Sequence, residues 1–274
     1  MAKTWFITGA GRGFGRSITI EALKRGDNVS ATVRTADALD DVSAAFGDAL
    51  QVQVLDVTDR DAGFAAVAAA KERFGSLDIA VNNAGYGLNG MLEEVSEQQA
   101  RTQMEVNFFG ALHITQAVLP VMREQGSGLI VQISSIGGVV AFPGLSIYHA
   151  SKWALEGMTE ALANEVAGYG IKTLIVEPGG YGTDWGGSSA VTADQHPAYA
   201  PLHEARAEAA KNYDPSLMGD PDALARELIE LVASESVPPR ALLGGMITDI
   251  AIGAYRERIE TWEAGRARAE AAQK

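Results

Sequence analysis

The sequence of 274 residues contains no cysteine, only four histidines and no apolar run of transmembrane length. Without cysteine, disulfides, thiol catalysis and thiolate metal sites are excluded. The histidines show no helical metal-ligand spacing and the acidic residues no metal-binding cluster, so we expect no metal. The first residues lack the pattern of a secretory signal peptide, and we expect a cytoplasmic protein.

A basic surface is missing as well. The chain has 35 acidic and 22 basic side chains, for a formal net charge of −13. This charge disfavours nucleic acids and anionic membranes as partners. The length and the 47% hydrophobic content are typical of one large α/β domain with a buried core.

The N-terminal segment predicts a strand, a glycine-rich turn and a helix. Residues 5–7 resemble a short buried strand, and residues 8–15 hold four glycines before an amphipathic stretch. A dinucleotide site requires this order, because glycines let the backbone approach a pyrophosphate and the helix N-terminus offers free N–H groups. Alone, the pattern is weak evidence for a dinucleotide site, because a glycine-rich turn can also be present without binding a ligand.

Tyr148 and Lys152 stand four residues apart, and therefore on one face of a predicted helix. An ammonium about 4 Å from the phenol would favour the phenolate by ~4 kcal/mol at an effective dielectric near 20, or roughly 3 pKa units. We therefore expect the pKa of Tyr148 to lie near neutral pH, where a general acid works best. The alternative is a helix that buries a tyrosine and exposes a lysine.

Further motifs follow in a fixed order. Residues 8–15 fit the pattern TGxxxGxG, residues 82–85 are NNAG, and Ser135 lies 13 residues before Tyr148. Asn107, the pair Pro178-Gly179 and Thr183 complete the series. In these motifs and their spacing, the chain resembles the short-chain dehydrogenase/reductase family in its non-extended branch, from about residue 3 to residue 243.

Strand-like and helix-like segments alternate through the middle of the chain. We predict strands at residues 29–33, 52–55, 79–82, 129–133 and 173–176, and helices at 62–74, 97–123 and 148–166. This alternation predicts an α/β fold, a doubly wound parallel sheet (Rossmann fold) with helices on both faces. We assign residues 1–245 to one catalytic domain with a substrate lid at 180–219. Residues 246–274 are expected to form a C-terminal helical extension packed on that domain.

The resemblance implies four catalytic residues. Tyr148 would donate a proton to a carbonyl oxygen, while Lys152 would lower the pKa of Tyr148 and bind the nicotinamide ribose. Ser135 would hold the substrate oxygen, and Ser134 is less favoured by its spacing. Asn107 would kink its helix and bind a water that relays protons to Lys152; the alternative is a polar residue satisfied by the backbone.

Charge predicts the cofactor. NAD-preferring relatives usually carry Asp where this sequence has Val33, and Arg34 follows. Arg12 in the glycine-rich turn is a second cation near the same ribose. Together Arg12 and Arg34 favour NADP(H), although each could be an ordinary surface arginine.

The resemblance also implies the remaining cofactor contacts. Asp56 could instead cap the next helix, and Tyr181 replaces a branched aliphatic residue that is common in relatives. Besides Tyr148 and Lys152, the implied contacts are Gly9, Gly11, Gly13, Phe14, Gly15, Asp56, Val57, Asn83, Ala84, Gly85, Pro178, Gly179, Tyr181 and Thr183.

Residues 180–219 are rich in Gly, Ser, Pro and Ala without a clear strand, which resembles the family's mobile substrate lid. Because this lid has few cations, we expect an apolar ketone or aldehyde rather than a strongly anionic substrate. The candidates within the lid, Trp185 and Tyr199, could instead pack the lid onto the body, whereas the other candidates flank the catalytic groups. The candidate substrate contacts are Phe142, Leu145, His149, Trp185 and Tyr199.

These observations predict an NADP(H)-dependent oxidoreductase that acts on a small-molecule carbonyl/alcohol pair, as a ketone or aldehyde reductase. The alternatives are an NAD-linked alcohol dehydrogenase of the same fold and, less favoured, a non-catalytic dinucleotide-binding regulator. Relatives usually pair through the helices predicted here at 97–123 and 148–166, so we expect a homodimer or homotetramer. The amphipathic stretch at 247–262 could instead cover that surface.

Overall fold

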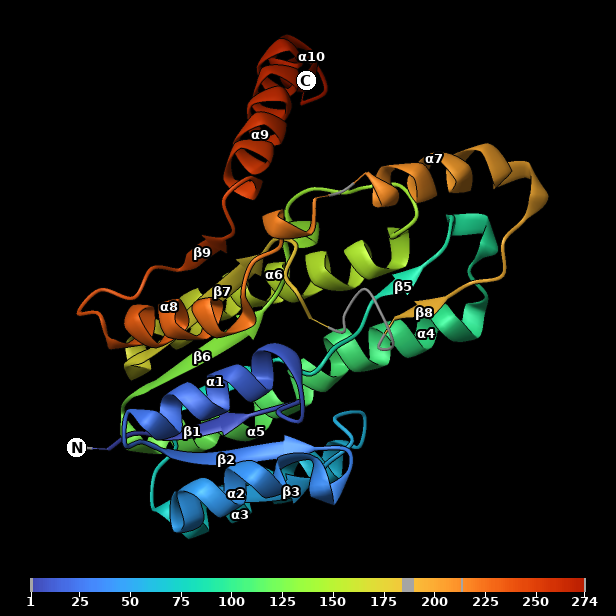
Figure 1. Cartoon of the computed structure of the whole chain (residues 1–274). Coiled ribbons are helices and arrows are strands. Elements are labelled where there is room, and N and C mark those ends of the chain that lie inside the picture. Colours follow the sequence, from blue (N-terminus) through green and yellow to red (C-terminus); the bar gives the residue numbers. More distant parts are fainter. Residues whose placement is uncertain (1, 184–189, 213, 274) are drawn as a thin grey trace.

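The computed structural model describes residues 2–183, 190–212 and 214–273. Its centre is a parallel sheet of seven strands in the order β3-β2-β1-β4-β6-β7-β9 (Figure 1). The prediction of a doubly wound sheet is confirmed, and each predicted strand is present within two residues at either end. The strands are β1 Thr4–Ile7, β2 Asn28–Val33, β3 Leu50–Val54, β4 Ile79–Asn82, β6 Gly128–Ile133, β7 Ile171–Pro178 and β9 Arg240–Leu243.

Helices cover both faces of the sheet, which explains why the central strands are continuous apolar runs rather than alternating ones. Two separate clusters of buried side chains result, one on each face. The first face carries α1 Gly13–Lys24, α2 Asp40–Phe46 and α8 Pro221–Ala233. The second carries α3 Arg60–Phe74, α5 Gly110–Gln125 and α6 Ser146–Val166.

The long helix predicted at 97–123 has a break in its hydrogen-bonding pattern. It begins as α4 Glu97–Met104, widens into a π-helical turn over Glu105–Phe109, and continues as α5. Asn107 lies at the centre of the widened turn and is buried. Such π-turns often occur at functional sites, and this one places Asn107 beside α6.

The strand order reverses between β1 and β4, since β2 and β3 lie on one side of β1 while β4, β6 and β7 lie on the other. A crevice opens beyond the carboxyl ends of the strands at such a reversal. The loops after β1, β4, β6 and β7 all begin there. The topology therefore gathers four separate stretches of sequence at one edge.

The lid contains more regular structure than the sequence indicates. β8 Val191–Thr192 pairs with β5 Leu88–Asn89, and α7 Ala200–Lys211 follows. Glu94 fastens α7, because its carboxylate accepts from Nε2 of His203 at 2.6 Å and from the N–H of His196 at 2.8 Å. Burial opposes ionisation of Glu94, but these partners lower its pKa to about 2.

The C-terminal extension forms α9 Ile247–Ala264 and α10 Arg266–Ala271. Only Ile247 and Ala251 of α9 are buried, and the helix projects from the body toward its C-terminal end (Figure 1). The helix that we expect to cover the body therefore covers little of it in one chain. Among the described residues, no helix has both the length and the apolar character needed to cross a bilayer.

Candidate active site

A cavity of about 1320 Å³ opens at the carboxyl ends of the strands. Twenty-one of the residues predicted to contact cofactor or substrate, or to take part in catalysis, line it. Gly15, Asn107 and Tyr199 do not line it, and Trp185 lies outside the described residues. The lining residues among those predicted are Gly9, Gly11, Arg12, Gly13, Phe14, Arg34, Asp56, Val57, Asn83, Ala84, Gly85, Ser135, Phe142, Leu145, Tyr148, His149, Lys152, Pro178, Gly179, Tyr181 and Thr183.

The glycine-rich turn is shaped by close backbone contacts. A Cβ atom on Gly15 would overlap the carbonyl oxygen of Gly9, which itself has a φ of +65°. Nδ2 of Asn83 donates to the carbonyl oxygens of Thr8 and Gly9, at 2.9 and 3.1 Å. Asn83 and Gly15 therefore hold the turn in shape. The first two residues of α1, Gly13 and Phe14, line the cavity, and the N–H groups at a helix N-terminus have no partner within the helix.

Two exposed arginines line the wall beside β1 and β2. Arg12 precedes α1 without a side-chain capping bond, and Arg34 follows β2. No described residue forms an ion pair with either guanidinium, whereas the nearby Arg16 pairs with Asp41. Both charges are therefore available to an anionic group in the cavity.

The acid after β3 does not cap a helix. Asp56 accepts hydrogen bonds from the N–H and the hydroxyl of Thr58, at 2.9 and 2.8 Å. The cap of α3 is Asp59, which accepts from the N–H of Ala62 at 3.0 Å. Asp59 therefore has the capping role that was the alternative for Asp56, and Asp56 lines the cavity wall.

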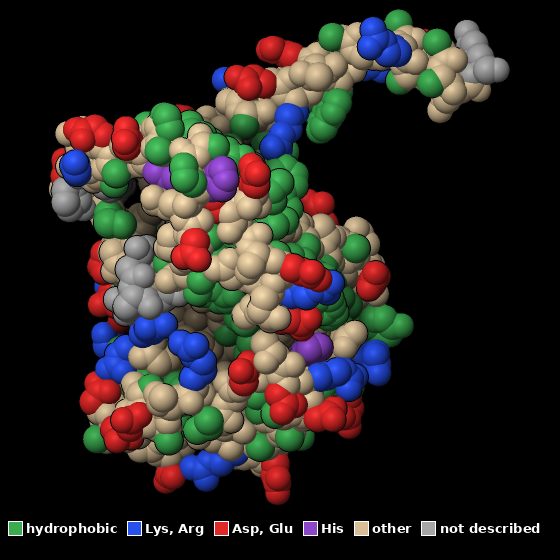
Figure 2. All heavy atoms as spheres, turned by 90° about the vertical axis from the view of Figure 1, so that its right-hand side faces the viewer, with side chains coloured by type: hydrophobic (Ala, Val, Ile, Leu, Met, Phe, Trp, Pro, Cys, Tyr) green, Lys and Arg blue, Asp and Glu red, His purple; other side chains and the backbone are tan. Residues whose placement is uncertain are grey.

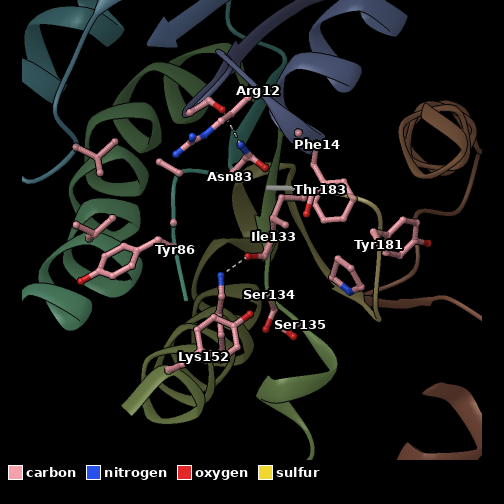
Figure 3. Close-up of a pocket in the computed structure, with 18 of the residues that line it drawn as sticks. Arg12, Phe14, Asn83, Tyr86, Ile133, Ser134, Ser135, Lys152, Tyr181 and Thr183 are labelled. Carbon is pink, nitrogen blue, oxygen red and sulfur yellow. Dashed lines mark hydrogen bonds between the residues drawn. The ribbon is translucent and has the colours of Figure 1, made fainter. Parts of the chain in front are cut away.

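Tyr148 and Lys152 lie one helical turn apart on α6, both nearly buried. Nζ of Lys152 donates to the carbonyl oxygen of Ile133 at 2.7 Å (Figure 3). The same nitrogen lies 6.0 Å from the centre of the Tyr148 ring. Burial raises the pKa of Tyr148 to about 12, and a hydrogen bond with Ser135 only partly opposes it. Burial likewise lowers the pKa of Lys152 to about 8, against the attraction of Glu156.

The expectation of a Tyr148 pKa near neutrality is therefore wrong for this structure. A pKa near neutrality would need an ammonium about 4 Å from a phenol that keeps its water. Here the ammonium is directed at Ile133, and the loss of water around the phenol outweighs its charge. The protonated phenol is the stable form at neutral pH.

Asn107 connects two parts of the site without reaching the cavity. Its Oδ1 accepts from the N–H of Tyr86 at 3.1 Å, and its Nδ2 donates to the carbonyl oxygen of Tyr86 and to Oγ of Ser151, each at 3.1 Å. The π-turn thus fixes the loop after β4 against α6. Asn107 positions the segment that carries Asn83.

His149 uses both ring nitrogens on the backbone. Nε2 accepts from the N–H of Phe142 at 2.9 Å, so Nδ1 carries the proton and donates to the carbonyl oxygen of Gly137 at 2.9 Å. The N–H of Gly137 in turn donates to Oγ of Ser135 at 3.0 Å. His149 therefore ties the Ser135 loop to the Phe142 loop and offers no free polar atom to a substrate.

Two tyrosines that were predicted as substrate or cofactor contacts make contacts with other side chains of the protein. Tyr199 donates to Glu93 at 2.8 Å, so it fastens the lid outside the cavity. Tyr181 packs edge-on against Phe14, with ring centres 5.1 Å apart (Figure 3), which gives this unusual tyrosine a packing role. Near the catalytic residues, the cavity is also lined by Tyr86, Ile136 and Val191, which were not predicted as contacts. Of these three, only Tyr86 carries a sequence signal, because it directly follows NNAG.

The sequence was compared with models of protein families and with curated proteins, and both comparisons find similar oxidoreductases. A family model described as short chain dehydrogenase matches residues 3–193. The chain is 39% identical over 245 residues to oxidoreductase BOA17 of Botryotinia fuckeliana, and the match covers 89% of each chain.

Two solved structures extend the comparison. A short-chain dehydrogenase from Streptomyces avermitilis is 39% identical, with a TM-score of 0.91 over 99% of this chain and 100% of its own. A short-chain dehydrogenase/reductase from Burkholderia phymatum, solved in complex with NAD, is 25% identical, with a TM-score of 0.80 over 96% of this chain and 95% of its own. The first of these matches the C-terminal extension as well as the body.

Proposed function

This chain belongs to the short-chain dehydrogenase/reductase family, and from that premise we propose that it transfers a hydride between NADP(H) and a carbonyl/alcohol pair. The observation that carries the proposal is one cavity whose wall holds Ser135, Tyr148 and Lys152 at one end and two arginines at the other. A dinucleotide extended between the two ends would bring its nicotinamide to the catalytic residues.

The cavity fits such a cofactor on three counts. Close contacts at Gly9 and Gly15 keep the turn free of side chains where a pyrophosphate would lie. The residues that begin α1 line the same cavity. The volume of about 1320 Å³ leaves room for both a dinucleotide and a substrate.

Each catalytic residue has a role that its surroundings support. When bound, the nicotinamide supplies or accepts the hydride. The hydroxyl of Tyr148 transfers its proton to the substrate oxygen, and its raised pKa keeps that proton available at neutral pH. Ser135 holds the same oxygen by a hydrogen bond. Lys152, charged below about pH 8, stabilises the phenolate left on Tyr148 and binds the ribose.

The preference for NADP(H) rests on Arg12 and Arg34. Each guanidinium can form charge-assisted hydrogen bonds with a 2′-phosphate, and Val33 provides no carboxylate for a free 2′-hydroxyl. The related structure from Burkholderia phymatum contains NAD, so an NAD-linked dehydrogenase remains the second candidate. The ratio of kcat/KM for the two cofactors distinguishes them.

The substrate end of the cavity favours a neutral, apolar carbonyl compound. Around Tyr148 the lining is aromatic and aliphatic, and Lys152 is the only charged side chain that the described residues place there. A carboxylate on the substrate would lose its water without gaining a cation of its own. The lining residues are Tyr86, Ile136, Phe142, Leu145, Val191 and Met218.

A matched substrate panel tests both parts of the proposal. We expect NADPH oxidation with an aromatic ketone such as acetophenone to exceed that with 4-carboxyacetophenone, which adds only the charge. Steroid ketones and aliphatic aldehydes widen the panel. Failure of every carbonyl compound and every alcohol to change the NADPH or NADP+ absorbance would leave the non-catalytic alternative.

A further inference from the structure

The projecting helix α9 has two different faces. Ile247 and Ala251 pack on the body, and on the same face the guanidinium of Arg258 lies 4.8 Å above the ring of Trp153 in α6. Arg258 also lies 4.9 Å from the ring of Tyr255. This face fixes the base of the arm, which we define as residues 247–271, against its own chain.

The second face is a stripe of large apolar side chains in water. Ile252, Tyr255, Ile259 and Trp262 are 42, 39, 47 and 65% exposed. Their spacing of three, four and three residues puts them on one side of the helix, as in the seam of a coiled coil. Figure 2 shows hydrophobic side chains along this arm, away from the rest of the molecule. Such a stripe is normally covered.

We propose that the arm pairs antiparallel with the arm of a second copy of this chain. The distribution of charge along the chain favours a second copy as the partner of the arm. The last 29 residues contain five acidic and five basic side chains, so the formal charge of −13 belongs to residues 1–245. Two bodies repel each other, whereas two arms meet without net charge.

The flank of the stripe sets the direction of pairing. Arg256 and Glu263 are seven residues apart and border the same side of the stripe. In an antiparallel pair, equal flanks face each other, so Arg256 can lie opposite Glu263 of the second copy, twice by symmetry. Ile259 then meets Trp262 of the second copy in the centre. A parallel pair would instead bring both acidic bodies to one end.

The arm is long enough for this contact. α9 has 18 residues, and α10 continues it beyond Gly265, whose backbone stays helical at φ −81° and ψ −8°. At 1.5 Å per residue, the arm spans roughly 37 Å, which keeps two antiparallel bodies apart at opposite ends. By contrast, Leu155, Leu162 and Val166 of α6 are already buried within one chain, so α6 offers less surface than its sequence indicates.

Light scattering over a dilution series of the full-length protein tests the pairing. We expect a mass of twice 28.9 kDa that falls to one chain on dilution. Ile259→Glu should give a monomer at every concentration. A wild-type protein that stays monomeric, or a dimer that survives Ile259→Glu, overturns the proposal.

Charge reversal tests the register. Arg256→Glu and Glu263→Arg should each weaken the dimer by about tenfold, because each creates two like-charge contacts. The double variant should restore the affinity to near that of the wild type. Glu257→Arg, on the opposite side of the helix, is the matched control and should change little. The antiparallel register would be contradicted if the two single variants weakened the dimer to different extents and the double variant did not recover the wild-type affinity.

The test is separate from that of the proposed activity. No residue of the arm lines the cavity among the described residues, so kcat per chain should stay unchanged in Ile259→Glu. An inactive wild-type protein that still dimerises through the arm would refute the enzyme proposal alone.

Discussion

Nζ of Lys152 lies 6.0 Å from the centre of the Tyr148 ring and donates its hydrogen bond to the carbonyl oxygen of Ile133. Both groups are buried, and because burial disfavours the charged form of each, it moves their pKa values apart, to about 12 for Tyr148 and about 8 for Lys152. At neutral pH both carry a proton. This is the state that carbonyl reduction requires.

The first prediction concerns pH. Lys152 is charged below about pH 8 in the free protein and loses its proton above it. We expect kcat/KM for carbonyl reduction to be level below that value and to fall about tenfold per pH unit above it. Initial rates across buffers of constant ionic strength give the profile. A level profile up to the ordinary lysine pKa of about 10.4 would contradict this assignment.

The second prediction concerns His149. Replacing it by Phe removes both backbone bonds that join the Ser135 and Phe142 loops. We expect kcat to fall by about 100-fold, since displacement of a catalytic group by 1 Å can have that effect, while the KM for NADPH stays unchanged. His149→Gln, which can keep one bond, should recover part of kcat. Full activity in His149→Phe would show that the loops hold without it.

The third prediction concerns Arg34. A carboxylate in Arg34→Asp would repel a 2′-phosphate and could accept a bond from a free 2′-hydroxyl. Losing a charge-assisted bond costs about 1.5–3 kcal/mol, or about 10- to 150-fold in the preference for NADPH over NADH. Arg25→Asp makes the same charge change at the far end of α1 and is the control. Equal KM values for the two cofactors in the wild type would refute the preference.

The fourth prediction concerns stability. Arg240 bonds to Glu156, Glu177 and Glu160, of which the first two have side chains only 5 and 3% exposed. Arg240→Met would remove the guanidinium that pairs with two buried carboxylates, at a cost of about 3 kcal/mol in the free energy of unfolding. Glu160→Gln, at a partner 63% exposed, should cost less than about 1 kcal/mol. Urea titrations give both values.

The same cluster has a pH signature. Burial and repulsion from Glu156 raise the pKa of Glu177 to about 7. A raised carboxyl pKa means that folding favours the protonated form, so this contribution is lost as pH rises through about 7 and returns at lower pH. The deficit of Arg240→Met should therefore shrink below neutral pH. A deficit that grows on acidification would contradict this.

The strands and their order along the chain could be predicted because short stretches of sequence carry their signals. The strand predicted at residues 79–82 begins with a short apolar run between Asp78 and Asn82, and β4 covers Ile79–Asn82. The position of Ser135, Asn83 and Pro178 just after predicted strands was enough to bring them to one edge. The family spacing of Asn107 likewise indicated a distorted helix, which the structure shows as a π-turn.

Long-range contacts escaped prediction. The Glu94–His203 pair joins residues 109 apart in sequence, and without it the lid helix α7 has only weak local signals. The pKa of Tyr148 depends on how deeply α6 is buried, which spacing alone does not reveal. The direction of α9 was equally hidden, because an amphipathic pattern indicates that a face is covered but not by which surface.

Replacement of Tyr148 by Phe tests the central claim most directly, because it removes the proton donor and almost nothing else. The measurement is kcat for NADPH oxidation with the best neutral ketone, alongside NADPH affinity from fluorescence titration. General acid catalysis accounts for about 10²–10⁴-fold in rate, so we expect kcat to fall by at least 100-fold while the affinity for NADPH stays within about twofold of the wild type. A variant that binds NADPH and keeps more than a tenth of the wild-type kcat would remove Tyr148 from the mechanism.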